Sequence, residues 1–335
     1  MTGRTADRGA PSTAPGKDDV PTHNPKAERA GWRLARRSPG SNPSRSGRRL
    51  DLLPYLLVTP LTGFILVLAI VPALYTLSQS FYRVQALDPP VRFNGLDNFR
   101  ALFADPTVQG SALNTVAYVI IGVTLTTVLG IVMALTLQRG FRGRPVLIAA
   151  MILPWALPGV VEGVVWTGIW DANTGLLNSL LTSAHLIDSY QVFLGHNRLL
   201  TILLIEIVQV WQMTPLSVLL VLAALQNIPG DLYEAAQLDG CTAWSTFTRV
   251  TLPLVRPGVA IAMVQALIAT LNVFDQPYVL NGAAETGASL TMQTYFISFQ
   301  NLDFGEGYAL SLLITLATLL GSFVLIKLVY RPVEF

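Results

Sequence analysis

Six acidic and amide side chains stand inside long apolar stretches of this 335-residue sequence. They are Glu162, Glu206, Gln209, Gln212, Asn272 and Asp275. Such side chains are costly in a membrane-spanning helix, and they usually face a cavity or a partner helix. At 1.5 Å per residue, all of them except Gln212 lie at depths of about 8 to 15 Å from the outer ends of three stretches. The set could therefore bind a polar solute by donating and accepting hydrogen bonds.

A second interpretation of the same residues remains open. Polar side chains on neighbouring helices can hydrogen-bond to one another and hold a bundle together, at about 0.6 kcal/mol per pair. The spacing of the six residues is compatible with either role.

Several kinds of chemistry have no motif in this sequence. The pair Gly16-Lys17 is followed by Asp18, so there is no phosphate-binding G-x-x-x-x-G-K-[ST] loop, and there is no G-x-S-x-G. The three histidines are scattered, and the single cysteine, Cys241, excludes an internal disulfide. We therefore expect no enzyme activity, no metal site and no cofactor bound by this chain. The net charge of +2 is too small to suggest nucleic acid.

The segment 227–257 has the pattern of a helix, a bend and a second helix. Asp231 is suited to the N-cap of the first short helix, and Gly240 to its C-terminal end. A second short helix from Thr242 would carry Trp244 and Phe247 on one face. Pro253 and Pro257 are then expected to break the chain before the next apolar stretch.

Small and charged residues in the first of these helices suit contact with another protein. Ala235 and Ala236 would allow a partner surface to approach closely, and Glu234 could pair with an arginine of that partner. Glu234 could also simply complete the start of the helix, three residues after Asp231. The two roles are compatible.

Composition shows which elements must position these residues. Hydrophobic residues make up 52% of the chain and charged residues only 13%, about half of what soluble domains carry. Six apolar stretches are each long enough to span a bilayer. They cover residues 54–80, 112–137, 145–170, 199–225, 258–280 and 308–330. We expect an all-α integral membrane protein with about six transmembrane helices.

Basic residues are distributed unevenly between the two sides of the predicted membrane. Residues 1–50 are rich in Pro, Gly, Ser and Arg, and we expect a disordered basic tail on the cytoplasmic side. With that tail inside, 18 of the 22 Lys and Arg lie on the cytoplasmic side, including those of the segment 138–144. Both termini and the loop 227–257 are then cytoplasmic, and residues 51–335 form the transmembrane domain.

The loop 227–257 resembles the EAA motif of permease subunits of bacterial ABC importers. The matching residues are Glu234, Ala235, Ala236, Asp239, Gly240, Leu252 and Pro253. Cys241 stands where that family more often has alanine. Two further segments, 94–106 followed by Asn114-Thr115, and 153–178, resemble the first permease of maltose-type systems. The resemblance covers roughly residues 50–335 and leaves out only the tail.

The resemblance implies a function and a set of partners. The chain would be the membrane-spanning subunit of an importer for a sugar or sugar-like solute, in a bacterial plasma membrane. Its partners would be a second homologous permease, an extracytoplasmic solute-binding protein and two ATPase subunits, which carry the ATP and Mg. The loop would be the coupling element, with Glu234, Ala235, Ala236, Asp239, Gly240, Trp244 and Phe247 at the ATPase.

Three alternative functions remain. One is uptake of glycerol phosphate or a glycerophosphodiester, which would favour basic residues in the cavity, and the second to fifth stretches contain none. Another is a stand-alone secondary transporter, which would need no docking loop and for which six helices without an internal repeat are unusual. The third is a membrane scaffold that transports nothing, and co-purification with an ATPase would separate these alternatives.

Overall fold

The computed structural model describes residues 52–282 and 284–330. The segment 1–50, for which we expect disorder, lies outside the described residues. The chain separates into two compact units, Met1–Thr62 and Gly63–Phe335, and the second holds the helical bundle.

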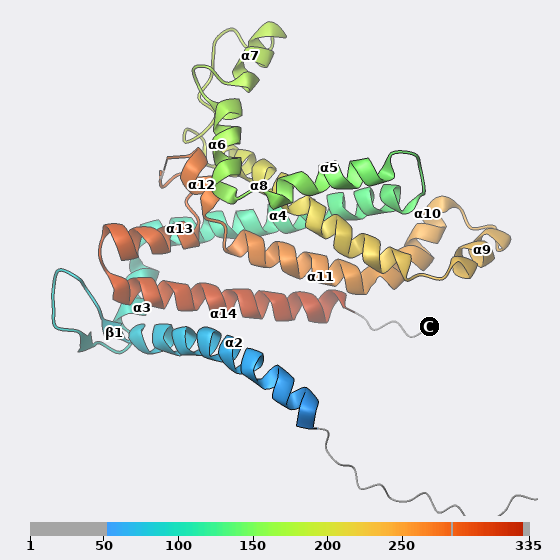
Figure 1. The fold of residues 1–335 in the computed structure, drawn as a ribbon. Helices are drawn as coiled ribbons and strands as arrows, with labels where there is room; N and C mark the ends of the chain where they lie inside the picture. The colour runs from blue at the N-terminus through green and yellow to red at the C-terminus, as the bar shows by residue number, and fades with distance from the viewer. Residues whose placement is uncertain (1–51, 283, 331–335) are drawn as a thin grey trace, which may run out of the picture. The chain divides into compact units, whose positions relative to one another are not determined.

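Helices form about three quarters of the described chain (Figure 1). In chain order the elements are α2 (Leu52–Gln79), β1 (Tyr82–Arg83), β2 (Arg92–Phe93), α3 (Asp97–Ala104), α4 (Pro106–Gln138), α5 (Arg144–Ala156), α6 (Gly159–Trp170), α7 (Leu176–Ser183), α8 (Arg198–Gln226), α9 (Gly230–Leu238), α10 (Ala243–Thr246), the π-helical turn η1 (Phe247–Thr251), α11 (Leu252–Leu271), α12 (Asp275–Leu280), α13 (Leu290–Tyr295), the π-helical turn η2 (Phe296–Gln300) and α14 (Phe304–Val329). The two short strands pair antiparallel.

The membrane-spanning character expected from composition is confirmed. Among the described residues, five helices are long and apolar enough to cross a bilayer: α2, α4, α8, the continuous run Ala243–Leu271 and α14. The pair α5 and α6 passes the same test as one bent span, which gives up to six. The chain is therefore an all-α membrane protein.

Three long helices, α4, α8 and α11, form the centre of the bundle. Leu137 of α4, Leu225 of α8 and Val255 of α11 are each 1% exposed and belong to one core cluster. Glycine allows the close approach of α4 to α8, because a Cβ added at Gly130 would lie 2.2 Å from Ser217 Oγ. Small residues at helix contacts are typical of membrane bundles, where backbones pack closely.

The third predicted span, 145–170, is broken. The helices α5 and α6 meet at an angle of 99° rather than forming one straight helix. The residue before a proline is biased away from the helical conformation, and Leu157, before Pro158, has a ψ of 137°. The α6 helix therefore leaves the direction of the bundle, as Figure 1 shows for the segment leading to α7.

The fifth predicted span, 258–280, has different boundaries. The helical run begins at Ala243, well before Gly258, and ends at Leu271. Pro253 lies in the first turn of α11 and Pro257 inside it, so neither proline breaks the chain as expected. At the other end the hydroxyls of Ser289 and Thr291 donate to the carbonyls of Val273 and Leu271. These bonds satisfy backbone groups that the end of the helix leaves free.

The two ends of the bundle carry different elements. Figure 1 shows α9 and α10 at one end, together with the junction of α4 and α5, and β1, α3, α12 and α13 toward the other. The segment 138–144 and the loop 227–257, both expected to be cytoplasmic, therefore lie at the same end.

Candidate functional site

A cavity of about 470 Å³, with four amide side chains and one carboxylate among apolar residues in its lining, lies beside α8 and the broken end of α11. Four of the six predicted pathway residues line it: Gln209, Gln212, Asn272 and Asp275. Gln276, Phe274, Met213 and Gly159 also contribute to its wall. The helices α8, α11 and α12 meet at this cavity, because the chain leaves α11 at Asn272 and restarts as α12 at Asp275. Side chains from the end of α11 and from α12 therefore turn toward α8.

Hydrogen bonds connect the back of this cavity to α6. The side-chain amide of Gln276 donates to Glu162 Oε2 and to Gln212 Oε1, each at 3.1 Å. Gln212 Nε2 in turn donates to the backbone carbonyl of Leu157, at the bend between α5 and α6. Glu162 is fully buried and does not line the cavity. It therefore holds the cavity wall in place rather than forming it.

Gln276 was not among the six residues predicted from the sequence. Its position inside the same apolar stretch as Asn272 and Asp275 was a usable signal. The chain break was not visible in the sequence, and it is the break that brings Gln276 beside Glu162.

Glu206 lies outside the cavity that the prediction assigned to it. Its side chain is fully buried, and a Cβ added at Gly122 of α4 would lie 2.7 Å from Oε2. No hydrogen-bond donor among the described residues reaches either carboxylate oxygen. Gln209, one turn along α8, lines the cavity, whereas Glu206 packs against α4.

The cavity lining offers hydrogen bonds and little charge. Asp275 is the one ionisable side chain among the described residues that line it, and no Lys, Arg or His does so. Gln209 is 3% exposed, and its carbonyl oxygen has no donor among the described residues. Phe274 adds an aromatic ring and stacks on Tyr278 with centroids 5.2 Å apart. Amides, one carboxylate and an aromatic face suit an uncharged, hydroxyl-rich solute.

The predicted helix–bend–helix is present at the other site. Gly240 has a φ of +73°, its N–H donates to Gln237 O and that of Cys241 donates to Ala236 O. This is the Schellman arrangement in which a left-handed glycine ends a helix. The start of α9 differs from the prediction, because Pro229 occupies the N-cap and Asp231 lies in the first turn without a side-chain cap.

The faces of α9 divide the predicted coupling residues into two sets. Glu234, Ala235, Asp239 and Gly240 are exposed. Ala236 is only 6% exposed, so it packs within the chain and is not free to accept a partner surface as expected. Tyr233, on the inner side, accepts a hydrogen bond from Thr251 of η1 at 3.3 Å.

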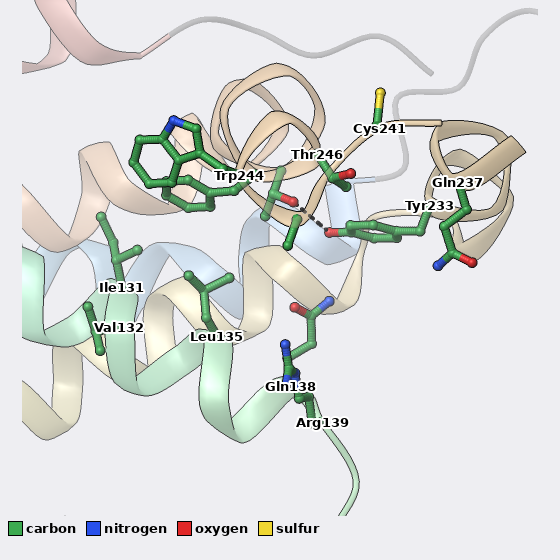
Figure 2. Close-up of a pocket in the computed structure, with 13 residues that line it drawn as sticks. Ile131, Val132, Leu135, Gln138, Arg139, Tyr233, Gln237, Cys241, Trp244 and Thr246 are labelled. Carbon is green, nitrogen blue, oxygen red and sulfur yellow. Dashed lines mark hydrogen bonds between the residues drawn. The ribbon is translucent and has the colours of Figure 1, made fainter. Parts of the chain in front are cut away.

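The aromatic pair of the second short helix lies beside a groove. Trp244 is 73% exposed, and its ring lies 5.6 Å from that of Phe247. Both line a groove of about 850 Å³ between the loop and the end of α4 (Figure 2). Its described lining residues are Ile131, Val132, Leu135, Gln138, Arg139, Tyr233, Gln237, Cys241, Ala243, Trp244, Thr246, Phe247 and Thr251.

These features define a class of protein. A bundle with five or six spans, a polar cavity beside a broken helix and an ordered helix–bend–helix at one end together describe a membrane transport subunit. The chain belongs to the family described as the inner membrane component of binding-protein-dependent transport systems, which matches residues 126–331.

Relatives of known function extend over most of the chain. It is 35% identical over 276 residues to the trehalose/maltose transport system permease protein MalF of Thermococcus litoralis, covering 82% of this chain and 92% of the relative. It is 31% identical to the trehalose transport system permease protein SugA of Mycobacterium tuberculosis, over 85% and 92%. It is 30% identical to the diacetylchitobiose uptake system permease protein NgcF of Streptomyces coelicolor, over 90% and 89%.

Solved structures share the fold. The chain is similar to one of a bacterial ABC transporter that imports the acidic polysaccharide alginate, with a TM-score of 0.71 and 22% identity. The similarity covers 85% of this chain and 97% of that one.

Proposed function

We propose that this chain is the permease subunit of an ATP-driven importer for a disaccharide, an oligosaccharide or a similar sugar. The observation that carries the proposal is the cavity lined by Gln209, Gln212, Asn272 and Gln276, with Phe274 in its wall. Amides can donate to and accept from sugar hydroxyls, and the aromatic ring can pack against the C–H face of a sugar. The relatives named for trehalose, maltose and diacetylchitobiose support the same solute class.

In this proposal the solute binds in the cavity, and the ATPase subunits bind at the opposite end of the bundle. The exposed face of α9, with Glu234, Ala235 and Asp239, contacts an ATPase subunit that holds ATP and Mg. Closure of two such subunits would move α9 and, through α8 and α11 on either side of the loop, the cavity walls. Both helices carry cavity residues, Gln209 on α8 and Asn272 at the end of α11.

The proposal includes partners and an orientation. A second permease, two ATPase subunits and an extracytoplasmic binding protein complete the transporter. A related alginate transporter has been solved with its solute-bound periplasmic protein. The basic segment 138–144 and the loop 227–257 face the cytoplasm, as do both termini, in a bacterial plasma membrane.

The competing proposal of a phosphorylated solute is less well supported, because no basic side chain among the described residues lines the cavity. The two are separated by reconstituting the complete transporter and measuring binding-protein-dependent uptake of disaccharides and of glycerol phosphate. We expect uptake of a disaccharide only. Uptake of glycerol phosphate alone would overturn the solute class.

A further inference from the structure

The groove at the cytoplasmic end combines an apolar floor with a positively charged rim. Ile131, Val132 and Leu135 of α4 form the floor, and Trp244 lies across from them (Figure 2). Phe247 also lines the groove, with its ring 5.6 Å from that of Trp244, and the two form an aromatic wall. Arg139, just beyond the last turn of α4, lies at the rim. No acidic side chain among the described residues lines the groove.

The charge at this rim is not neutralised within the described part of the chain. Arg139 is exposed and takes part in none of the hydrogen bonds or ion pairs found there. The ion pairs of the described residues, Arg83 with Asp88 and Arg100 with Asp97, belong to the other end of the bundle. Arg142 and Arg144 follow in the same segment and add positive charge.

The floor reaches into the membrane. Ile131 precedes Gln138 by seven residues, which places it about 10 Å along a membrane-spanning helix from the end of α4. A soluble partner would have to enter the apolar layer to fill that part of the groove, whereas an acyl chain already occupies that layer. Tryptophan is also enriched where the apolar layer meets the headgroups, and Trp244 is the most exposed aromatic side chain in the groove wall.

We propose that this groove binds one anionic phospholipid of the cytoplasmic leaflet. Its phosphate would lie at Arg139 and one acyl chain along Ile131, Val132 and Leu135. The assignment of the lipid to the cytoplasmic leaflet rests on the orientation given with the proposed function. The assignment of the groove as a lipid site does not. Because the opposite wall belongs to α9, α10 and η1, the bound lipid would connect α4 to the loop that carries Glu234. The lipid composition of the membrane would then act on that loop directly.

The test uses the complete transporter in vesicles of phosphatidylcholine that contain a photoreactive phosphatidylglycerol. Cross-linked peptides are mapped by mass spectrometry, and a photoreactive phosphatidylcholine serves as the neutral comparison. We expect phosphatidylglycerol adducts on residues 131–139 and 241–247, and we expect unlabelled phosphatidylglycerol to compete. Equal labelling by the neutral lipid would overturn the proposal, as would no adduct in the groove of the assembled complex.

A matched pair of arginine variants tests whether the site is local. One basic residue near an anionic membrane surface contributes about 1 kcal/mol, so Arg139→Gln should lower labelling of the groove about five-fold. Arg142→Gln makes the same charge change in the same segment but outside the groove lining, and it should lower labelling less than two-fold. Equal losses in the two variants would mean diffuse attraction to the membrane surface and no site.

The cross-linking of the native groove and of the arginine variants is measured without any assay of transport. Failure of sugar uptake with intact groove labelling would contradict the proposed function and leave the lipid site standing. Val132→Trp, which fills the floor, should reduce labelling even where Arg139 is retained, and its assembly is checked by co-purification of the ATPase. Labelling that Val132→Trp leaves unchanged would place the lipid elsewhere.

Discussion

The amide side chains that line the cavity differ in which of their atoms are still without a hydrogen-bond partner. The Gln276 amide nitrogen is already shared between Glu162 and Gln212. The Gln209 carbonyl oxygen is buried and has no donor among the described residues. A buried polar group without a partner is costly, and a solute hydroxyl could remove that cost. Gln209 is therefore the cavity residue whose free oxygen would accept from a sugar hydroxyl once its side chain turns into the cavity.

The first prediction concerns this residue. Gln209→Leu should weaken the apparent affinity for sugar about three- to ten-fold, the value of one hydrogen bond of 0.5 to 1.5 kcal/mol. Asn272→Leu should have a smaller effect, because Asn272 already donates to Ile268 O at 2.8 Å. The measurement is the sugar dependence of ATP hydrolysis in the reconstituted transporter, with saturating binding protein and normalised to assembled complex.

Gln265→Leu is the control for that experiment. Gln265 lies on α11 but lines a different, largely apolar pocket, so the same substitution there should leave the affinity unchanged. If Gln209→Leu lowers assembly while the half-saturating sugar concentration stays constant, the amide holds helices together and the site assignment is wrong.

At the scale of elements, the bend between α5 and α6 determines the shape of the cavity. It places Gly159 of α6 directly against α12, where an added Cβ would lie 2.4 Å from Asp275 Oδ2. Gly163, one turn further, is also close to α12, because an added Cβ would lie 2.8 Å from the Cβ of Val279. Glycine at both positions lets α6 approach α12 closely enough for Glu162 to accept from Gln276.

We therefore predict that Gly159→Ala damages the cavity. Overpacking typically costs about 1 to 3 kcal/mol, and here the displaced atoms belong to Asp275 in the cavity wall. The melting temperature of the detergent-solubilised complex should fall, and sugar affinity should fall with it. Gly168→Ala on the same helix meets no atom within 4 Å and should be neutral or slightly stabilising. Similar behaviour of the two variants would remove the role given to this contact.

A further prediction concerns the glycine at the C-terminal end of α9. Gly240→Val should disrupt the Schellman arrangement, because a non-glycine residue in the left-handed conformation costs about 1 to 2 kcal/mol, and more for a β-branched side chain. Uptake should be lost while the protein remains in the membrane. The control is Gly140→Val in the segment 138–144 at the same end of the bundle, where Gly140 has no positive φ and no close contact. Normal uptake and ATPase association in Gly240→Val would exclude this bend from coupling.

The ends and breaks of the helices differ in how well the sequence alone predicts them. The position of Gly240 at the C-terminal end of α9 was predictable, because an Asp-Gly pair after a short helical segment is compatible with few other backbone structures. The break at Pro158 follows from a visible proline, although its angle of 99° does not. The end of α11 at Leu271 had no sequence signal, since hydroxyls of Ser289 and Thr291, far along the chain, satisfy the freed carbonyls. The position of Glu206 outside the cavity was unpredictable for a related reason: residue spacing gives the face of a helix on which a side chain lies but not the neighbouring helix that covers that face.

For the whole molecule, we infer the orientation in the membrane from the distribution of charge. With residues 1–50 on the cytoplasmic side, the sequence has 18 of its 22 basic residues on that side, as positive loop charge favours. The segments 138–144 and 227–257 lie at one end of the bundle, as this orientation requires (Figure 1).

This orientation is tested with single cysteines and an impermeant thiol reagent on intact cells. Cys241 is first replaced by serine, since it is only partly buried at the cytoplasmic end and would add background. A cysteine at exposed Asn301, toward the opposite end, should then be labelled in intact cells, and one at Gly140 only after permeabilisation. The reverse pattern would invert the orientation.

In the proposed function, this membrane subunit binds a sugar and receives the energy of ATP hydrolysis through the exposed face of α9. The most direct test measures ATP hydrolysis by the reconstituted transporter as sugar-loaded binding protein is added, for the native chain and for Glu234→Lys. We predict that sugar-loaded binding protein stimulates the native transporter and not Glu234→Lys, because the reversed charge would repel a basic partner surface. Full stimulation of Glu234→Lys would contradict the coupling role of α9, and no response of the native transporter to any sugar would contradict the function itself.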